Sequence, residues 1–137
     1  APQIGAQNLL PSFVVLPWAA ARAHAPYSRF PVGAAFEADS GDIVTGCNVE
    51  NAAYSNVSCA EAGAISAMIA AGGTRIVTIA VVGGIQGEPS RACTPCGGCR
   101  QRIDEFADGN TRLIVKDNDE NWHSYSMEEL LPSSFHL

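Results

Sequence analysis

The stretch that decides the fold is "CAEAGAISAMIAAGGTRIVTIAVV", residues 59–82. Residues 59–71 are rich in good helix formers, and the two glycines after them predict the end of a helix. Residues 75–82 form an apolar run rich in β-branched side chains, which is typical of a buried strand. A helix that leads into a buried strand favours an α/β domain.

Outside this stretch, the pattern continues to alternate between strands and helices. Apolar residues and turn signals predict a helix over 8–24 that Pro17 delays or kinks, strands over 32–37 and 43–48 around a turn at 39–42, a helix over 97–106, strands over 112–116 and 122–125, and a short helix over 127–131. Such alternation predicts a layered α/β domain. A length of 137 residues fits one domain that spans residues 1–137.

The charge pattern excludes one class of partner. The net charge is −6, and Lys116 is the single lysine. Proteins that bind nucleic acid polymers neutralise phosphates with clustered Lys and Arg, and this sequence has no such cluster. A small-molecule ligand is therefore favoured. Only 16% of the residues are charged, against about 25% in an average soluble domain, which favours a surface partly covered by other subunits.

The segment "LLPSFVVLPWAAARAHA", residues 9–25, imitates a secretory signal. No Lys or Arg precedes it, and two prolines interrupt it, so we do not expect it to be cleaved. It is also too short to span a membrane. We therefore expect a cytoplasmic protein with reduced thiols, and its odd number of cysteines, five, agrees with metal ligands or free thiols.

Cysteines stand at the starts of two predicted helices. Cys59 begins one helix, with Glu61 two residues later, and Cys96 and Cys99 follow Pro95 at the start of another. A helix N-terminus favours thiolate over thiol. If the two helix starts face each other, three thiolates converge and leave a zinc ion one open coordination position. Glu61 would then lie beside the ion as a carrier of protons.

The residues alone leave other interpretations open. Cys59 could be an ordinary buried thiol, and Glu61 a carboxylate in the first turn of a helix. Cys93 could join the other three cysteines in a closed structural zinc site. A redox-active pair of cysteines is a third possibility, although such pairs normally have no third cysteine nearby.

The motifs also resemble a known family. "CAE" (59–61) followed by "PCGGCRQ" (95–101) resembles the all-cysteine form of the zinc-dependent deaminase signature. "PYSRFPVGAAF" (26–36), "GCNVENAAYS" (46–55) and "LLPSSF" (130–135) are similar to the small homotetrameric cytidine deaminases. The resemblance implies a three-layer α/β/α sandwich around a mixed five-stranded sheet. It further implies one zinc ion per subunit, a homotetramer, and hydrolytic deamination of cytidine and deoxycytidine in pyrimidine salvage.

The resemblance also assigns roles to individual residues. Cys59, Cys96 and Cys99 would hold the zinc ion, and Glu61 would be the catalytic proton carrier. The expected substrate contacts are ribose hydroxyls for Asn48 and Glu50, the face of the pyrimidine for Phe30, the base edge for the backbone of Ala60, and a neighbouring subunit's site for Ala52, Tyr54 and Phe135. Asn48 and Glu50 alternate onto one face of a strand end, where they could instead cap a turn.

One position departs from the family pattern. Family members commonly carry Arg directly after the catalytic Glu, and Ala62 occupies that position here. Three thiolates on a divalent ion leave one net negative charge, so we expect compensation, with Arg100 and Arg91 as candidates. A blasticidin-type deaminase is the nearest alternative enzyme, but it would not be expected to keep "FPVGAAF" and "NVEN". A non-catalytic, zinc-stabilised binding module is the alternative from another class.

Overall fold

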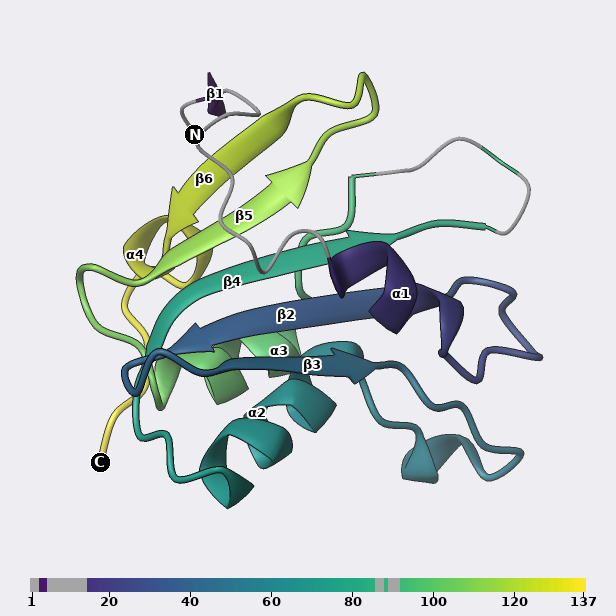
Figure 1. Ribbon diagram of the computed structural model, residues 1–137, viewed down its shortest axis with the longest axis horizontal. Coiled ribbons are helices and arrows are strands. Elements are labelled where there is room, and N and C mark those ends of the chain that lie inside the picture. The colour runs from purple at the N-terminus through teal and green to yellow at the C-terminus, as the bar shows by residue number, and fades with distance from the viewer. Residues whose placement is uncertain (1–2, 5–14, 86–87, 89–91) are drawn as a thin grey trace.

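The computed structural model describes residues 3–4, 15–85, 88 and 92–137, and all of its described strands belong to one sheet (Figure 1). Along the chain, the elements are β1 (Gln3–Ile4), α1 (Leu16–Ala21), β2 (Val32–Ala38), β3 (Ile43–Cys47), the 3-10 helix η3 (Tyr54–Asn56), α2 (Ala60–Ala70), β4 (Ile76–Gly83), α3 (Gly97–Asp104), β5 (Arg112–Lys116), β6 (Trp122–Ser126) and α4 (Met127–Leu130).

The sheet is mixed, as predicted, and its strand order is β1-β6-β5-β4-β2-β3. β4 and β5 run parallel, and the other neighbours are antiparallel. A parallel pair needs a crossover connection, and α3 lies in the segment that joins β4 to β5. The predicted mixed sheet of five strands is confirmed in β2 to β6. β1 adds a sixth strand of only two residues, which is too short to give a sequence pattern.

The two faces of the sheet carry separate apolar cores. In β2, the side chains of Phe36 and its second neighbours join a large core with α2, α3 and α4, whereas Ala35 faces the opposite way and packs with Leu16 of α1. Figure 1 shows α1 in front of the sheet and α3 on its other side, behind β2. This alternation along the strands confirms the predicted three-layer α/β/α architecture.

The first helix is much shorter than the predicted range 8–24. α1 spans Leu16–Ala21, and Pro17 occupies its first turn, where the missing backbone N–H costs no hydrogen bond. Residues 8–14 of the predicted helix lie outside the described residues. None of the helices that the structure describes has the length and apolarity needed to cross a bilayer.

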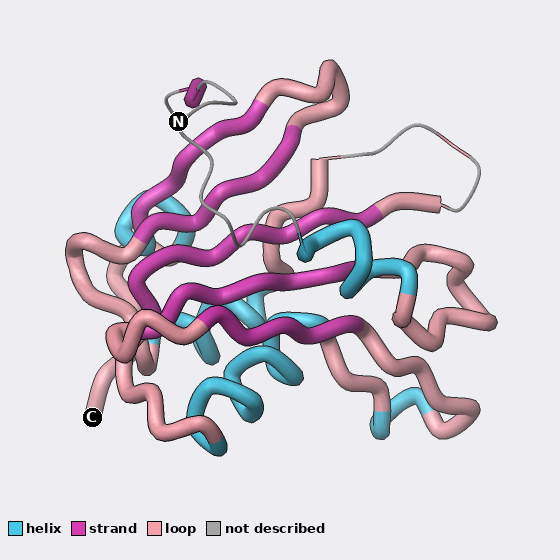
Figure 2. The backbone as a smooth tube through the Cα atoms, viewed as in Figure 1, coloured by secondary structure: helices cyan, strands magenta, loops and turns pink. Residues whose placement is uncertain are grey.

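α2 rests directly on the backbone of β3. A Cβ atom added to Gly46 would lie only 2.2 Å from the carbonyl oxygen of Ala60 and 2.5 Å from the backbone nitrogen of Ala64. In Figure 2, α2 runs alongside β3, the strand at one edge of the sheet. This close approach fixes the first turn of α2, which follows Cys59, against the sheet.

Candidate active site

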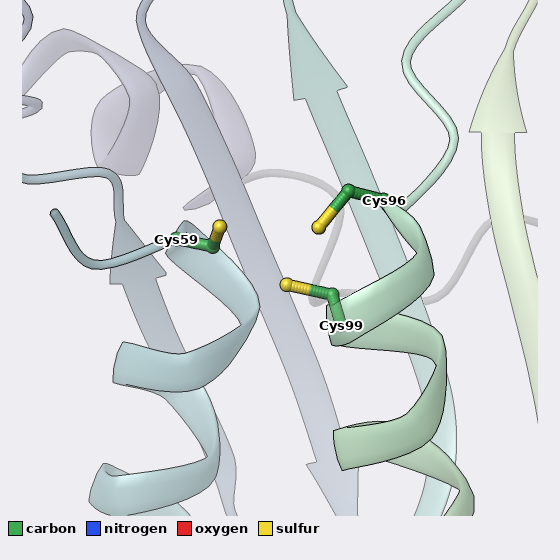
Figure 3. Close-up of side chains that lie close together, drawn as sticks. All are labelled: Cys59, Cys96 and Cys99. Carbon is green, nitrogen blue, oxygen red and sulfur yellow. The ribbon is translucent and has the colours of Figure 1, made fainter. Parts of the chain in front are cut away.

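Two helices begin at cysteines, and their starts face each other. Cys59 is the residue before the first turn of α2, and Cys96 holds the same place in α3. Cys99 follows in the first turn of α3 and is fully buried. The sulfur atoms of these three cysteines lie within 4.8 Å of one another, and Figure 3 shows them pointing into one common space.

This donor set fits one zinc ion. Zinc prefers thiolate and imidazole ligands, with Zn–S bonds of about 2.3 Å that place tetrahedral sulfurs about 3.8 Å apart. Three converging sulfurs satisfy that arrangement with little movement and leave a fourth position open. An open position is characteristic of catalytic zinc sites, whereas structural sites are closed by a fourth protein ligand.

Cys93 lies outside this group of sulfurs. Its sulfur packs against the backbone of Gly83 at the end of β4, where an added Cβ would be 2.8 Å from it. Burial raises the pKa of the Cys93 thiol to about 11. Among the residues that the structure describes, the closed site of four sulfurs is therefore not formed.

The expected effect of the helix N-termini on the thiols holds for one cysteine only. The backbone N–H of Cys99 lowers the pKa of Cys96. Burial raises the pKa of both Cys59 and Cys99, because an apolar environment disfavours the thiolate. A metal ion that binds here must therefore displace protons from these two thiols.

Glu61 lies in the first turn of α2, beside the three sulfurs. Its side chain is buried, with only 4% of the residue exposed, and its Oε2 accepts a hydrogen bond from the Cys99 thiol at 3.6 Å. Burial raises the pKa of Glu61 above its usual value, and the positive charge of Arg102 opposes this shift. A buried carboxyl with a raised pKa can both accept and donate a proton near neutral pH.

The arginine near the sulfurs is not one of the two that the sequence suggested. Arg100 donates to the carbonyl oxygens of Pro95 and Leu130, both at 2.8 Å, and so ties α3 to the end of α4. Arg91 lies outside the described residues. Instead, Nη1 of Arg102 lies 4.0 Å from the sulfur of Cys99. The signal for Arg102 was its position three residues after Cys99 in a predicted helix.

Asn48 and Glu50 both hold the segment that precedes β2. The Asn48 side chain accepts a hydrogen bond from the backbone of Val32 and donates one to the carbonyl of Phe30. Oε1 of Glu50 accepts from the backbone N–H groups of Tyr27 and Ser28. The Ser28 hydroxyl and these N–H groups lower the pKa of Glu50, which keeps it ionised.

Phe30 lies just before β2, and Ala60 is the first residue of α2. The Phe30 ring packs over Gly83, where an added Cβ would be 2.9 Å from a ring carbon. Ala60 is buried in the first turn of α2, and backbone N–H groups in a first turn have no partner within their own helix. The N–H of Ala60 is one of these groups.

The residues expected to reach a neighbouring subunit are exposed. Ala52 is exposed. Tyr54 is 79% exposed, and its ring forms a T-shaped pair with the ring of Tyr27 at a centroid distance of 6.5 Å. Phe135 is 68% exposed, and its carbonyl accepts a hydrogen bond from Gln101 of α3.

Comparisons with known proteins agree with this geometry. Residues 13–115 match the family model of the cytidine and deoxycytidylate deaminase zinc-binding region. A cytidine deaminase from Sporosarcina psychrophila is 40% identical over 114 residues, which cover 83% of this chain and 81% of that protein.

Solved structures give the same result. The crystal structure of a cytidine deaminase from Mycobacterium tuberculosis is 37% identical, with a TM-score of 0.75 over 91% of this chain and 98% of that one. A cytidine deaminase from Burkholderia pseudomallei is 35% identical, with a TM-score of 0.80 over 90% of this chain and 96% of that one.

Proposed function

The chain belongs to the cytidine and deoxycytidylate deaminase family, and we propose that it hydrolyses cytidine and deoxycytidine to the uracil nucleosides and ammonia. The observation that carries this proposal is the convergence of three cysteine sulfurs, with one open metal position, beside the buried carboxyl of Glu61. A closed structural zinc site would have neither the open position nor a use for that carboxyl.

Cys59, Cys96 and Cys99 would hold the zinc ion, which supplies a Lewis acid that makes water nucleophilic near neutral pH. Glu61 takes a proton from the attacking water and delivers it to ring nitrogen N3, and it carries a second proton to the amino group at C4. The C4–O bond forms, the C4–N bond breaks, and ammonia leaves. Because each proton comes from the water, Glu61 returns to its starting state.

The nucleoside would be oriented by residues around the metal. Glu50 is held in place through Oε1, so its Oε2 is the atom that would accept from a ribose hydroxyl. Asn48 fixes the backbone on both sides of Pro31, and this positions the Phe30 ring to pack on the pyrimidine. The N–H of Ala60 would donate to the base edge.

We further propose that the chain forms a single domain over residues 1–137 and assembles as a homotetramer whose sites are completed by neighbouring subunits. Exposed large apolar side chains support this assembly, since Tyr27, Tyr54 and Phe135 are each more than half exposed. Ala52 and Tyr54 would contact a neighbour's substrate, and Phe135 would reach it from the C-terminal segment. Zinc-binding thiols must remain reduced, which favours the cytoplasm. Deamination of free nucleosides would give the chain a role in pyrimidine salvage.

An ultraviolet assay of deamination on cytidine, deoxycytidine and free cytosine tests the proposal. The parent protein should deaminate the two nucleosides and act poorly on cytosine, because a site built to hydrogen-bond ribose discriminates against a ligand without it. Glu61→Gln should keep its zinc and lose at least about 10⁴-fold in kcat, since general acid–base catalysis is worth about 10²–10⁴-fold and Glu61 serves more than one transfer.

Glu105→Gln, an exposed change just after α3, is the matched control and should leave turnover unchanged. A parent protein that binds zinc but deaminates no cytosine nucleoside would identify a zinc-stabilised binding module instead. Near-normal turnover by Glu61→Gln would show that another group carries the protons.

A further inference from the structure

The metal site carries an excess of negative charge. Two positive charges on zinc and three negative charges on the thiolates of Cys59, Cys96 and Cys99 leave one negative charge. The carboxylate of Glu61, 3.6 Å from the Cys99 sulfur, adds a second one. Buried charge is unfavourable unless an opposite charge or a set of hydrogen bonds compensates it. The site is therefore stabilised by a nearby cation or by hydrogen bonds to its sulfurs.

The nearby side chains narrow the choice of that cation. Ala62, which follows Glu61, brings no charge. The guanidinium of Arg100 donates to the carbonyls of Pro95 and Leu130. In the part of the chain that the structure describes, Arg102 is the cationic residue that contacts one of the three sulfurs. Its Nη1 lies 4.0 Å from the sulfur of Cys99.

The geometry of α3 explains how Arg102 reaches this place. Residues three apart in a helix share a face, and long side chains lean back toward the N-terminus, so Arg102 extends over Cys99. Gly98 leaves room for it, because an added Cβ at Gly98 would be 3.2 Å from Nη1 of Arg102. The N-terminal end of a helix repels a cation unless an anion lies there. The Cys99 thiolate would be that anion.

We infer that Arg102 is a positioning residue for the metal site, whose guanidinium offsets the charge of the zinc-bound Cys99 thiolate and holds that ligand in place. Arg102 acts through Cys99 and does not touch the substrate. Donation of an N–H to the sulfur withdraws electron density from it, so the ion keeps more of its Lewis acidity. The inference depends on the proposed function in one respect, because that function identifies the metal as zinc.

The test uses the full chain and measures metal binding apart from turnover. Zinc retention is followed by competition with a chelator in the parent, Arg102→Gln and Arg102→Lys. We expect about 10- to 100-fold weaker zinc binding in Arg102→Gln, the usual effect of removing a group that supports a metal ligand. Arg102→Lys should lose less, since it keeps the charge. Arg112→Gln, an exposed loss of the same charge at the start of β5, is the control and should not change zinc binding.

Cobalt(II) substitution gives a second measurement, which a merely structural role of Arg102 would not change. Loss of the guanidinium raises the energy of the sulfur electrons, so the thiolate-to-cobalt absorption band of Arg102→Gln should move to longer wavelength. The band should stay in place in Arg112→Gln. Parent-like zinc affinity and an unmoved band in Arg102→Gln would overturn the inference. If Arg102→Gln does not fold, Arg102→Lys decides: a smaller loss of zinc affinity and a smaller shift of the band are expected there, because lysine keeps the charge but cannot reproduce the guanidinium contact, and no change in either would overturn the inference. A parent that binds no zinc would instead overturn the proposed function.

Discussion

Replacing Gly46 with alanine should displace the first turn of α2 and so disturb the metal site. The new Cβ would lie 2.2 Å from the carbonyl oxygen of Ala60, whereas real Cβ atoms essentially never come closer than 3.0 Å to another heavy atom. The first turn of α2 must therefore move away from β3 by at least the difference, 3.0 − 2.2 = 0.8 Å. Both atoms that the Cβ would meet first are backbone atoms, so no side-chain rotation can relieve the contact.

The cost of this movement can be estimated. Overpacking a core typically costs about 1–3 kcal/mol, and a clash between backbone atoms belongs at the upper end, about 3 kcal/mol. For a chain of this length, that corresponds to a decrease in Tm of about 10 °C. The movement also carries Cys59 along, and metal–ligand distances stay within about 0.2 Å of their usual values. We therefore expect Gly46→Ala to lose zinc as well as stability.

Thermal unfolding and zinc analysis of Gly46→Ala measure both effects, and Gly63→Ala is the matched control. Gly63 lies in α2 opposite Gly46, but a Cβ there would meet its nearest neighbours at 3.8 and 3.9 Å, which are ordinary contacts. Because alanine is favoured over glycine within a helix by about 1 kcal/mol, Gly63→Ala should be as stable as the parent or more so. A Gly46→Ala protein with parent-like Tm and full zinc content would refute the reasoning.

Three further substitutions test the metal site and the turn between β2 and β3. Cys93→Ser should retain full zinc, because the Cys93 sulfur lies outside the cluster of three sulfurs, whereas Cys59→Ser should lose the metal. If a zinc assay finds that Cys93→Ser loses the metal and Cys59→Ser keeps it, the ligands are misassigned. Hydrogen bonds from Thr74 and Arg75 lower the pKa of Asp39 from 3.8 to about 2. The ionised carboxylate therefore stabilises the fold fully above pH 3.8, and this stabilisation disappears as the pH falls toward about 2. Urea unfolding between pH 5 and pH 2 should show a smaller loss of stability for Asp39→Asn than for the parent, and equal pH dependence would contradict this role.

Strong patterns predicted the central elements well. The apolar run at residues 112–116 predicts β5 (Arg112–Lys116) residue for residue, because turns bound it on both sides. The helix predicted over 97–106 ends earlier, at Asp104. Its C-terminal part leaves the helix because the carbonyl of Phe106 accepts a hydrogen bond from Ile76 at the start of β4. That contact joins residues far apart in sequence, so no local pattern could predict it.

The site shows the same division between local and distant information. The spacing of Cys96 and Cys99, and of Cys59 and Glu61, is local and predicts the cluster that the structure contains. The bonds of Glu50 to residues more than 20 positions away are not local, so its part in shaping the segment before β2 could not be predicted.

Arg102 was missed for a different reason. The sequence does place it on the same helical face as Cys99, but it does not show that Gly98 leaves space for the guanidinium or that Arg100 is bound elsewhere. Only the packing of α3 against its neighbours distinguishes the two arginines.

Because the three sulfurs come from two separate helices, a bound ion cross-links the chain and closes a ring. Cys59 and Cys96 are 96 − 59 = 37 positions apart, and this ring includes β4 and the segment that follows it. Joining two such positions removes conformational entropy from the unfolded chain, worth about 4 kcal/mol by the estimate used for disulfides. That entropy depends only on the logarithm of ring size, so doubling the ring would change it by about 0.6 kcal/mol. Insertions between β4 and Cys93 should therefore be nearly neutral for stability, which leaves the length of this segment free to vary while the metal site stays intact.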